Sequence, residues 1–280
     1  MHIISKVKET TKKWNLLSKK DRILVAVSGG KDSASVLYIL KKISYNVEAL
    51  HLQLGVGAWS EKCLEAVQEL CKKLDVKLHI FDIKKTFGTS MCYLRNVVQS
   101  KQKLRNCHVC GVLKRQLINK LARKLKATKL VTGHNLDDEA QTILMNFLLG
   151  NLEVAKRIGP ISGLIKDKKF VPRVKPLYFC SEKDILKFAL AKKLPFVKEA
   201  CPCSADAFRR KIKEWLDHFS DKEKMKFVRF FLKKIKPKLE KKDFELKYCT
   251  ICNEPTAKEI CKICSLFKDV FEKVEKCMVA

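Results

Sequence analysis

The sequence lacks the features of a membrane or exported protein. No apolar run is long enough to span a bilayer. Residues 1–20 are polar and basic, without the hydrophobic core of a signal peptide. Internal repeats and low-complexity tracts are absent as well. We therefore predict a cytoplasmic protein without a membrane partner.

Acidic residues are scarce relative to basic ones. The 280 residues include 59 Lys and Arg but only 30 Asp and Glu, a formal net charge of +29. This excess is far larger than solubility requires and favours a polyanionic partner, nucleic acid before an anionic membrane. A genome-wide lysine bias is the alternative explanation. The length suits one large domain with small appendages.

Residues 23–33 combine a strand, a glycine turn and the start of a helix. Five apolar, mostly β-branched residues at 23–27 predict a buried parallel strand. Residues 28–30 then turn the chain sharply, and we expect Asp32 or Ser33 to cap the helix that follows. Backbone N–H groups at such a helix start form an anion site, and glycines let the ligand approach closely.

The anion site is not a Walker A loop, because the G-x-x-x-x-G-K-[ST] spacing is absent. Lys31 is expected to add a mobile positive charge to the turn. An ordinary glycine turn after a strand is the alternative interpretation.

Strands and helices alternate along the chain, which predicts an α/β fold with a doubly wound parallel sheet. Further strands are expected at 47–54, 76–83, 129–133 and 170–174, and helices at 34–42, 61–74, 110–125, 136–149 and 181–190. Ligands of such sheets bind at the carboxyl ends of the strands. The glycine turn, Gln53 and Gly133 all fall there.

The pattern changes after residue 205 to helices dense in Arg and Lys with interleaved aromatic residues. We expect the aromatic residues to pack against the core rather than to stack on bases, and the basic face to be solvated or to lie along phosphates. The predicted units are a basic N-terminal helix (1–20), a catalytic domain (21–205), a basic helical segment (206–245) and a C-terminal cysteine segment with a helix (246–280).

Thirteen cysteines in a reducing compartment favour metal sites over a disulfide framework. Cys107 and Cys110 form a C-x-x-C, and Cys201 and Cys203 follow far along the chain. A C-x-x-C at a helix start serves as a redox pair, as zinc ligands or as iron–sulfur ligands. A zinc site of these four cysteines is one alternative that the spacing leaves open.

The spacing of the second cysteine group indicates one kind of metal site more specifically. Cys249, Cys252, Cys261 and Cys264 follow the pattern C-x₂-C-x₈-C-x₂-C, which predicts a tetrahedral Zn²⁺ site in a small zinc ribbon. The stretch is too short for a core, so zinc would supply its folding energy. The remaining cysteines have no ligand spacing and are expected to be core or surface residues: Cys63, Cys71, Cys92, Cys180 and Cys277.

Taken together, the motifs resemble those of the PP-loop ATP pyrophosphatases, and among them the tRNA 2-thiouridine synthetase (tRNA 2-sulfurtransferase) group. The resemblance rests on the S-G-G-K-D-S turn at 28–33, the C-x-x-C, the G-H-N-L-D-D-E-A-Q-T segment at 133–142 and the cysteine ribbon. It covers residues 20–265. It implies the adenine nucleotide α-hydrolase-like fold and adenylation of a base oxygen by Mg²⁺-ATP.

The resemblance also implies roles for individual residues. The expected ATP site consists of Ala26, Ser28, Gly29, Gly30, Lys31, Asp32, Ser33, Leu52, Lys114, Gly133, His134 and Asp138. Lys114 and Asp138 would form the catalytic pair, with Lys114 neutralising charge on the α-phosphate. Asp137 and Asp138 together would hold Mg²⁺ or orient the attacked oxygen. The alternative is a charge pair at a helix start.

A [4Fe-4S] cluster on Cys107, Cys110 and Cys201 is implied in the same way, with one iron left open for sulfide. Cys203 departs from the family pattern, and we interpret it as a bystander because C-x-C geometry disfavours two ligands to one cluster. Gln53 replaces an acid of the family, which weakens any metal or ribose role there. The family's N-terminal zinc finger cannot form, because no cysteine precedes Cys63.

The implied function is ATP-dependent 2-thiolation of a tRNA uridine, either the T-loop 5-methyluridine or the wobble uridine. The sulfur donor would be free sulfide or a ubiquitin-like thiocarboxylate protein, and a homodimer is an open alternative. Two other functions stay open: another PP-loop adenylating enzyme, such as a tRNA-modifying ligase or amidotransferase-like ligase with zinc in place of the cluster, and a nucleic-acid-binding zinc protein with a vestigial nucleotide site.

Overall fold

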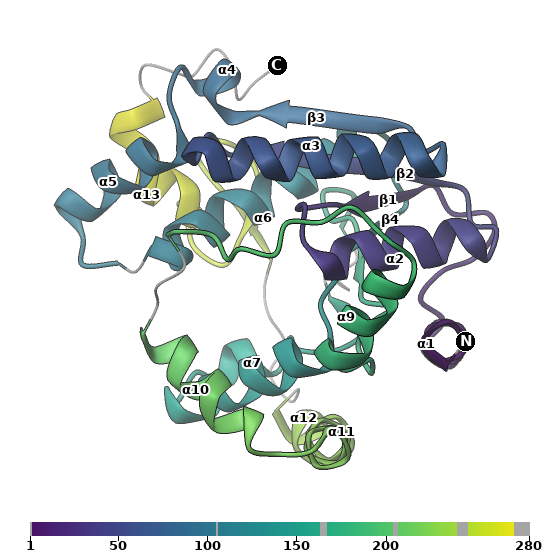
Figure 1. Cartoon of the computed structure of the whole chain (residues 1–280). Coiled ribbons are helices and arrows are strands. Elements are labelled where there is room, and N and C mark those ends of the chain that lie inside the picture. Colours follow the sequence, from purple (N-terminus) through teal and green to yellow (C-terminus); the bar gives the residue numbers. More distant parts are fainter. Residues whose placement is uncertain (1, 105, 163–166, 204–206, 240–245, 272–280) are drawn as a thin grey trace.

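A six-stranded sheet in the order β3-β2-β1-β4-β6-β5 lies at the centre of the computed structural model, which describes residues 2–104, 106–162, 167–203, 207–239 and 246–271 (Figure 1). Its parallel strands are β1 (Ile23–Ala26), β2 (Val47–Gln53), β3 (Leu78–Asp82), β4 (Lys129–Val131) and β6 (Arg173–Val174). The predicted α/β fold with a parallel sheet is confirmed. The edge strand β5 (Ile161–Ser162) pairs antiparallel with β6 and was not predicted.

The strand order places the switch point of the sheet between β1 and β4. From β1 the chain proceeds outward through β2 to β3, and it then returns to add β4 on the other side of β1. The loops after two such strands diverge and leave a crevice at the carboxyl edge of the sheet. Residues 27–30 and 132–135 are those loops, so the fold brings the glycine turn and the second predicted motif together.

Helices cover both faces of this sheet. On one face α2 (Lys31–Lys42), α3 (Gly57–Leu74) and α9 (Glu182–Ala191) pack against Val25 and Ala49. On the other face α6 (Asn106–Lys124) packs against Leu24, Leu50 and Leu130. Because neighbouring residues of a strand point to opposite faces, the unbroken apolar run of β1 is explained by burial on both sides.

Several element boundaries differ from the prediction. Gly30, and not Asp32 or Ser33, is the N-cap of α2, so both side chains lie in the first helical turn. Residues 86–106, for which the sequence predicted no element, contain α5 (Met91–Lys101), and α4 (Ile83–Phe87) precedes it. The N-terminal helix α1 (His2–Lys13) docks on α9 through a Lys6–Asp184 ion pair of 3.1 Å.

A second layer of helices has its own apolar core. It contains α7 (Leu136–Leu148), α8 (Leu152–Ala155), α10 (Ala207–Asp217), α11 (Asp221–Phe230), the π-helical turn η1 (Phe231–Ile235) and α12 (Lys236–Leu239). Figure 1 shows this layer below the sheet. Phe231 is fully buried in it, but the prediction that the aromatic residues are buried is wrong for three others. Trp215, Phe219 and Phe230 are 52%, 37% and 55% exposed.

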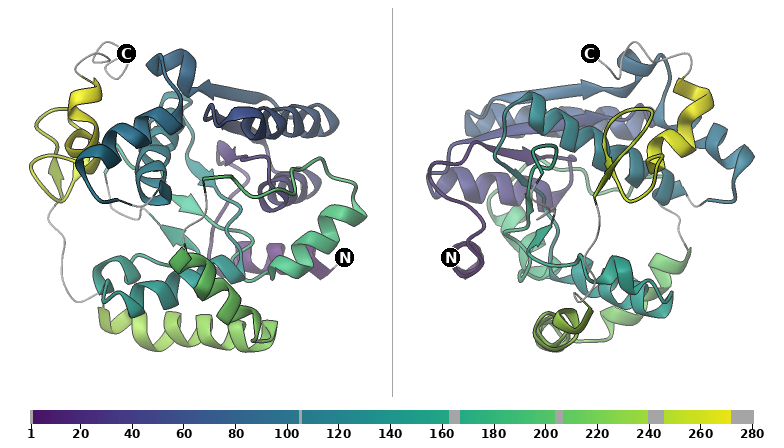
Figure 2. Two further views of the ribbon diagram at one scale, coloured as in Figure 1. Left: turned by 60° about the vertical axis from the view of Figure 1, so that its left-hand side comes forward. Right: turned by 180° about the vertical axis from the view of Figure 1, so that it is seen from behind.

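The C-terminal segment lies beside α5 and α6 (Figure 2). A two-stranded ribbon of β7 (Lys247–Tyr248) and β8 (Pro255–Thr256) leads into α13 (Lys262–Phe271). Phe267 of α13 is buried with Leu94 and Leu113 of the two neighbouring helices. No helix in the described part of the chain is long and apolar enough to cross a membrane.

Candidate active site

The turn after β1 is held by close backbone packing. Gly29 has φ +88°, and a Cβ at this position would lie 2.8 Å from the Cα of Cys63 in α3. The Ser33 hydroxyl accepts a hydrogen bond from the Ser28 N–H (3.1 Å) and donates one to the Gly30 carbonyl (2.9 Å). No side chain caps α2. The first turn of this helix can therefore present its N–H groups to an anion.

Lys31 is not the mobile charge that the sequence predicted. Its Nζ lies 2.9 Å from Glu182 and 3.1 Å from Asp32. Burial opposes the charge of this ammonium group, but the two carboxylates outweigh burial and raise the pKa of Lys31. Glu182 also accepts from Lys213 (2.8 Å). Burial disfavours its charge, yet the two lysines lower the pKa of Glu182 to about 2, so Glu182 is ionised.

Asn135 joins the two motifs at the switch point. Its side-chain oxygen accepts from the N–H groups of Asp137 and Asp138 (both 3.0 Å), which makes it the N-cap of α7. Its Nδ2 donates to the Asp32 carboxylate (3.0 Å), and its N–H donates to the Asp138 carboxylate (3.2 Å). Burial, and then the charge of Asp32, raise the pKa of Asp138 to about 6. Two carboxylates from different motifs therefore face one region.

The predicted Asp137–Asp138 pair does not share a site. Asp137 accepts from the Lys224 ammonium (2.7 Å) and from the N–H of Glu182 (2.7 Å). Lys224 is only 6% exposed, so this ion pair ties α11 to the first turn of α7. Asp137 is thus a structural residue that links three helices, and Asp32 takes its place beside Asp138.

The other predicted nucleotide residues lie at the same edge of the sheet. Ala26 and Leu52 are at the ends of adjacent strands. A Cβ at Gly133 would be 2.8 Å from the backbone nitrogen of Ser33, so this glycine lets the loop after β4 touch α2. His134 follows it. Gln53 is buried, and neither polar atom of its amide has a partner in the described part of the chain.

The cysteines of the C-x-x-C lie near those that follow α9. The Cys107 thiol is 4.0 Å from the Cys203 carbonyl oxygen. Burial raises the pKa of Cys201, and the charges of Cys203, Cys110 and Lys114 also act on it. No hydrogen bond or ion pair in the described residues joins Lys114 to Asp138, the two residues predicted to form the catalytic pair.

These thiols fit an iron–sulfur cluster better than a single metal ion. Among the described residues, Cys107, Cys110 and Cys201 do not lie within 4.8 Å of one another. A tetrahedral zinc ion needs sulfurs about 3.8 Å apart, because Zn–S bonds are about 2.3 Å long. Cluster thiolates each bind a different iron and stand further apart. Sequence reasoning missed Cys92, whose sulfur is 4.0 Å from that of Cys203, because no spacing links the two.

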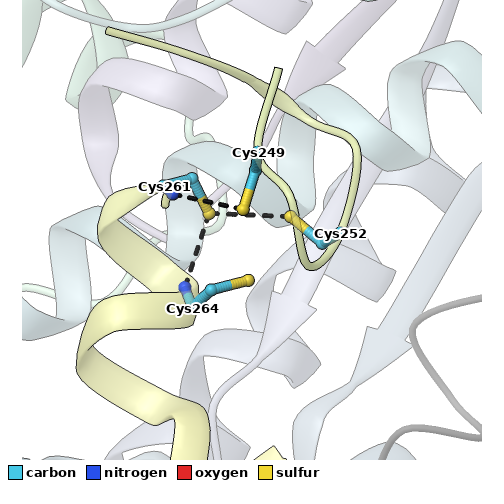
Figure 3. Close-up of side chains that lie close together, drawn as sticks. All are labelled: Cys249, Cys252, Cys261 and Cys264. Atoms are coloured by element: carbon cyan, nitrogen blue, oxygen red, sulfur yellow. Dashed lines mark hydrogen bonds between the residues drawn. The ribbon is translucent and has the colours of Figure 1, made fainter. Parts of the chain in front are cut away.

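The C-terminal cysteines do have single-ion geometry. The sulfurs of Cys249, Cys252, Cys261 and Cys264 all lie within 4.8 Å of one another (Figure 3). Backbone N–H groups of Cys261 and Cys264 point at the sulfurs of Cys249 (3.2 Å) and Cys261 (3.4 Å). Such bonds favour the thiolate form that a metal requires. The donor set suits Zn²⁺.

Comparisons with known proteins agree with this geometry. The PP-loop domain family matches residues 1–217. The chain is 40% identical over 268 residues to the tRNA-5-methyluridine(54) 2-sulfurtransferase of Pyrococcus horikoshii, across 94% of this chain and 83% of that protein. It is 34% identical over 277 residues to the protein of the same name from Thermotoga maritima, across 98% and 90%.

The fold of a solved relative also matches. The U34-tRNA thiolase NcsA from Methanococcus maripaludis, with its [4Fe-4S] cluster, superposes with a TM-score of 0.78 and 27% identity, across 96% of this chain and 87% of that one. The family resemblance that the motifs predicted is therefore confirmed. The chain belongs to the PP-loop family, in its group of tRNA 2-sulfurtransferases.

Proposed function

We propose that this protein is an ATP-dependent tRNA 2-sulfurtransferase that replaces O2 of a uridine with sulfur. One observation carries the proposal: Cys63 joins two groups of the site, because it packs against Gly29 and the charge of Cys201 acts on it. The first group is the uncapped N-terminus of α2 with Asp32 and Asp138, and the second is the cysteines with Lys114. The first group suits Mg²⁺-ATP, and the second suits sulfur chemistry. Adenylation and sulfur transfer act on the same base, so both groups of residues must lie around it.

The glycine turn and α2 form the proposed ATP site. The backbone at 28–33 would receive the phosphates, with Lys31 released from Glu182 as the phosphates arrive. Asp32 and Asp138 would hold Mg²⁺, since carboxylate oxygens are its preferred protein ligands. The strand ends at Ala26 and Leu52 would flank the adenine. Gly133 and His134 would close the other side.

Lys114 is the residue proposed to act on the reacting α-phosphate. It lies one helical turn beyond Cys110 on α6, and its charge reaches Cys201. As uridine O2 attacks and pyrophosphate leaves, an ammonium group here would neutralise charge that develops on the phosphate. Cys107, Cys110 and Cys201 would hold the [4Fe-4S] cluster, which supplies an iron with an open position for sulfide.

The target is proposed to be the T-loop 5-methyluridine, because the relatives that are 40% and 34% identical carry that activity in their names. The wobble uridine is the second candidate, since the solved relative is named for it. The sulfur would come from free sulfide or from a thiocarboxylate on a small protein. No two of the described cysteines form a disulfide, which suits a reducing cytoplasm.

The test is nucleoside mass spectrometry on unmodified tRNA. The tRNA is incubated anaerobically with iron-reconstituted protein, Mg²⁺-ATP and sulfide, and then mapped by nuclease fragments. We expect a 2-thiouridine derivative with the wild type and the control Cys71→Ala, and none with Lys114→Ala or Cys201→Ala. Pyrophosphate release without sulfur in the tRNA would favour another adenylating reaction.

The colour of the protein tests the zinc alternative separately. An iron–sulfur protein purified without oxygen is brown, and it loses its visible absorbance when Cys107→Ala or Cys201→Ala removes a ligand. Zinc at the same cysteines gives a colourless protein. A colourless, zinc-loaded site that still adenylates tRNA would make this a PP-loop ligase of another kind.

A further inference from the structure

The charges of four cationic side chains from distant parts of the sequence act on His134. These side chains are Arg115 of α6, Arg173 of β6, Lys175 and Arg209 of α10. Burial, and after it the charges of these four groups, lower the pKa of His134 to about 3. The imidazole is therefore neutral at physiological pH, and it lies within a region of strong positive potential at the carboxyl end of β4.

Two of these arginines, Arg115 and Arg173, have no carboxylate partner in the described part of the chain. Arg173 instead donates from Nη2 to the backbone oxygen of Arg115 (2.8 Å). Burial, and then the charge of Arg115, lower the pKa of Arg173 to about 10. Lys175 differs, because it pairs with Glu139 at 2.6 Å. The charges of Arg115 and Arg173 therefore repel one another, and a bound anion would relieve this repulsion.

The position of Arg115 is set by its own helix. Its Nη1 lies so close to Gly111 that a Cβ there would be 3.0 Å away. The side chain of Arg115 is nevertheless solvent-accessible. The charge of Lys114 acts on Cys201, and the charge of Arg115 acts on Cys110 as well as on His134. Arg115 thus adds positive charge between the cysteines and the loop after β4.

The phosphates of ATP do not account for these cations. The nucleotide has the N-terminus of α2, Lys31 and the Asp32–Asp138 carboxylates for its metal. A second anion remains to be identified. A tRNA substrate carries a phosphodiester beside every base, and planar guanidinium groups bind such a phosphate in bidentate fashion.

We propose that Arg115 and Arg173 bind the backbone phosphate next to the target nucleotide of the tRNA. The pair would fix the strand at one side of Lys114, so that the adjoining base falls between the ATP site and the cysteines. Lys175 and Arg209 would add a longer-range electrostatic attraction for the tRNA backbone. This role rests on the proposed function, and within that function Arg115 and Arg173 select the position of the target base.

Binding measurements on the iron-loaded, full-length protein test the proposal. The dissociation constants for unmodified tRNA, at several salt concentrations, and for ATP are measured separately for Arg115→Gln, Arg173→Gln and the control Lys42→Gln, which removes an exposed charge of α2. We expect each arginine variant to bind tRNA about tenfold more weakly, with a salt slope smaller by about one. ATP binding should not change, and Lys42→Gln should match the wild type.

The two dissociation constants of the arginine variants separate the possible roles of Arg115 and Arg173. Weaker ATP binding with unchanged tRNA binding would make the pair a nucleotide phosphate site. No change in either constant would make it a structural cluster, and both results overturn the inference. Arg115 makes no hydrogen bond through its guanidinium in the described residues, so Arg115→Gln stays informative if Arg173→Gln unfolds. If the wild-type protein binds no tRNA, the proposed function is wrong, and this outcome differs from a failure at the two arginines.

Discussion

The Asn135 side-chain amide donates a hydrogen bond of 3.0 Å to the carboxylate of Asp32, across 103 residues of sequence. The same side chain caps α7 by accepting two backbone N–H bonds. One residue therefore fixes both the start of α7 and the direction of the Asp32 carboxylate. We therefore expect stability and nucleotide binding to be coupled at this position.

Replacement of Asn135 should cost more activity than stability. Asn135→Ala removes an N-cap, which costs about 1 kcal/mol, and leaves Asp32 free to turn away from Asp138. Ser220→Ala is the matched control, because Ser220 forms the same capping box at α11 on an exposed surface. We expect similar losses in urea unfolding, but about a tenfold fall in pyrophosphate release only for Asn135→Ala. Equal activities would refute the coupling.

Two glycines with positive φ should differ in their tolerance of a side chain. Gly29 and Gly88 have φ of +88° and +69°, so alanine costs each about 1–2 kcal/mol in backbone strain. Only at Gly29 would the new Cβ meet another backbone, 2.8 Å from Cys63. Overpacking adds about 1–3 kcal/mol there. Gly29→Ala should therefore lose ATP binding and more of its unfolding free energy than Gly88→Ala, as measured by calorimetry and urea unfolding.

Substitution by Asn should change the stability of the protein in opposite directions at the adjacent residues Asp137 and Asp138. The pKa of Asp138 is raised by burial to about 6, above the unfolded value of about 3.9. Its protonated form is favoured by folding, so this contribution is fully present below pH 4 and is lost as the pH rises through 6. Asp138→Asn should stabilise the nucleotide-free protein at pH 7.5 and abolish turnover.

Asp137→Asn leaves the buried ammonium group of Lys224 with only the exposed Asp217 carboxylate, at 3.8 Å, in place of the 2.7 Å ion pair with Asp137. Breaking such a pair costs about 3 kcal/mol, so this variant should be less stable at pH 7.5. Thermal unfolding of both variants from pH 4 to 8 measures the contrast. A stabilisation that does not disappear at pH 4 would show that the effect of Asp138→Asn is unrelated to its charge.

The parts of the site that sequence reasoning predicted are local in sequence. The strand, glycine turn and helix at 23–42 are dictated by neighbouring residues, and so is the cysteine ribbon. The partner of Asp137 lies 87 residues away on α11, and no local pattern could identify it. The same holds for Arg115 and Arg173, since each reads as an ordinary surface cation until the sheet order brings β6 beside β4. Trp215 was misassigned because helical spacing indicates a face but not what covers it.

The C-terminal cysteines give the last prediction. Zinc at Cys249, Cys252, Cys261 and Cys264 would hold α13 in place, and Phe267 of α13 packs against α5 and α6. Without the metal, the short ribbon has little apolar surface with which to resist unfolding. Because α6 also carries Cys107 and Cys110, loosening the ribbon should reduce iron loading at a distance.

Elemental analysis of Cys261→Ser and of the control Cys71→Ala measures both effects. The wild type and Cys71→Ala should hold about one zinc per chain. Cys261→Ser should lose the zinc, become sensitive to limited proteolysis within 246–271 and hold less iron after reconstitution. Iron loading that stays unchanged without zinc would show that the ribbon folds apart from the cysteine site. Iron instead of zinc at these four cysteines would overturn the metal assignment, because a Cys₄ site of this size accepts either ion.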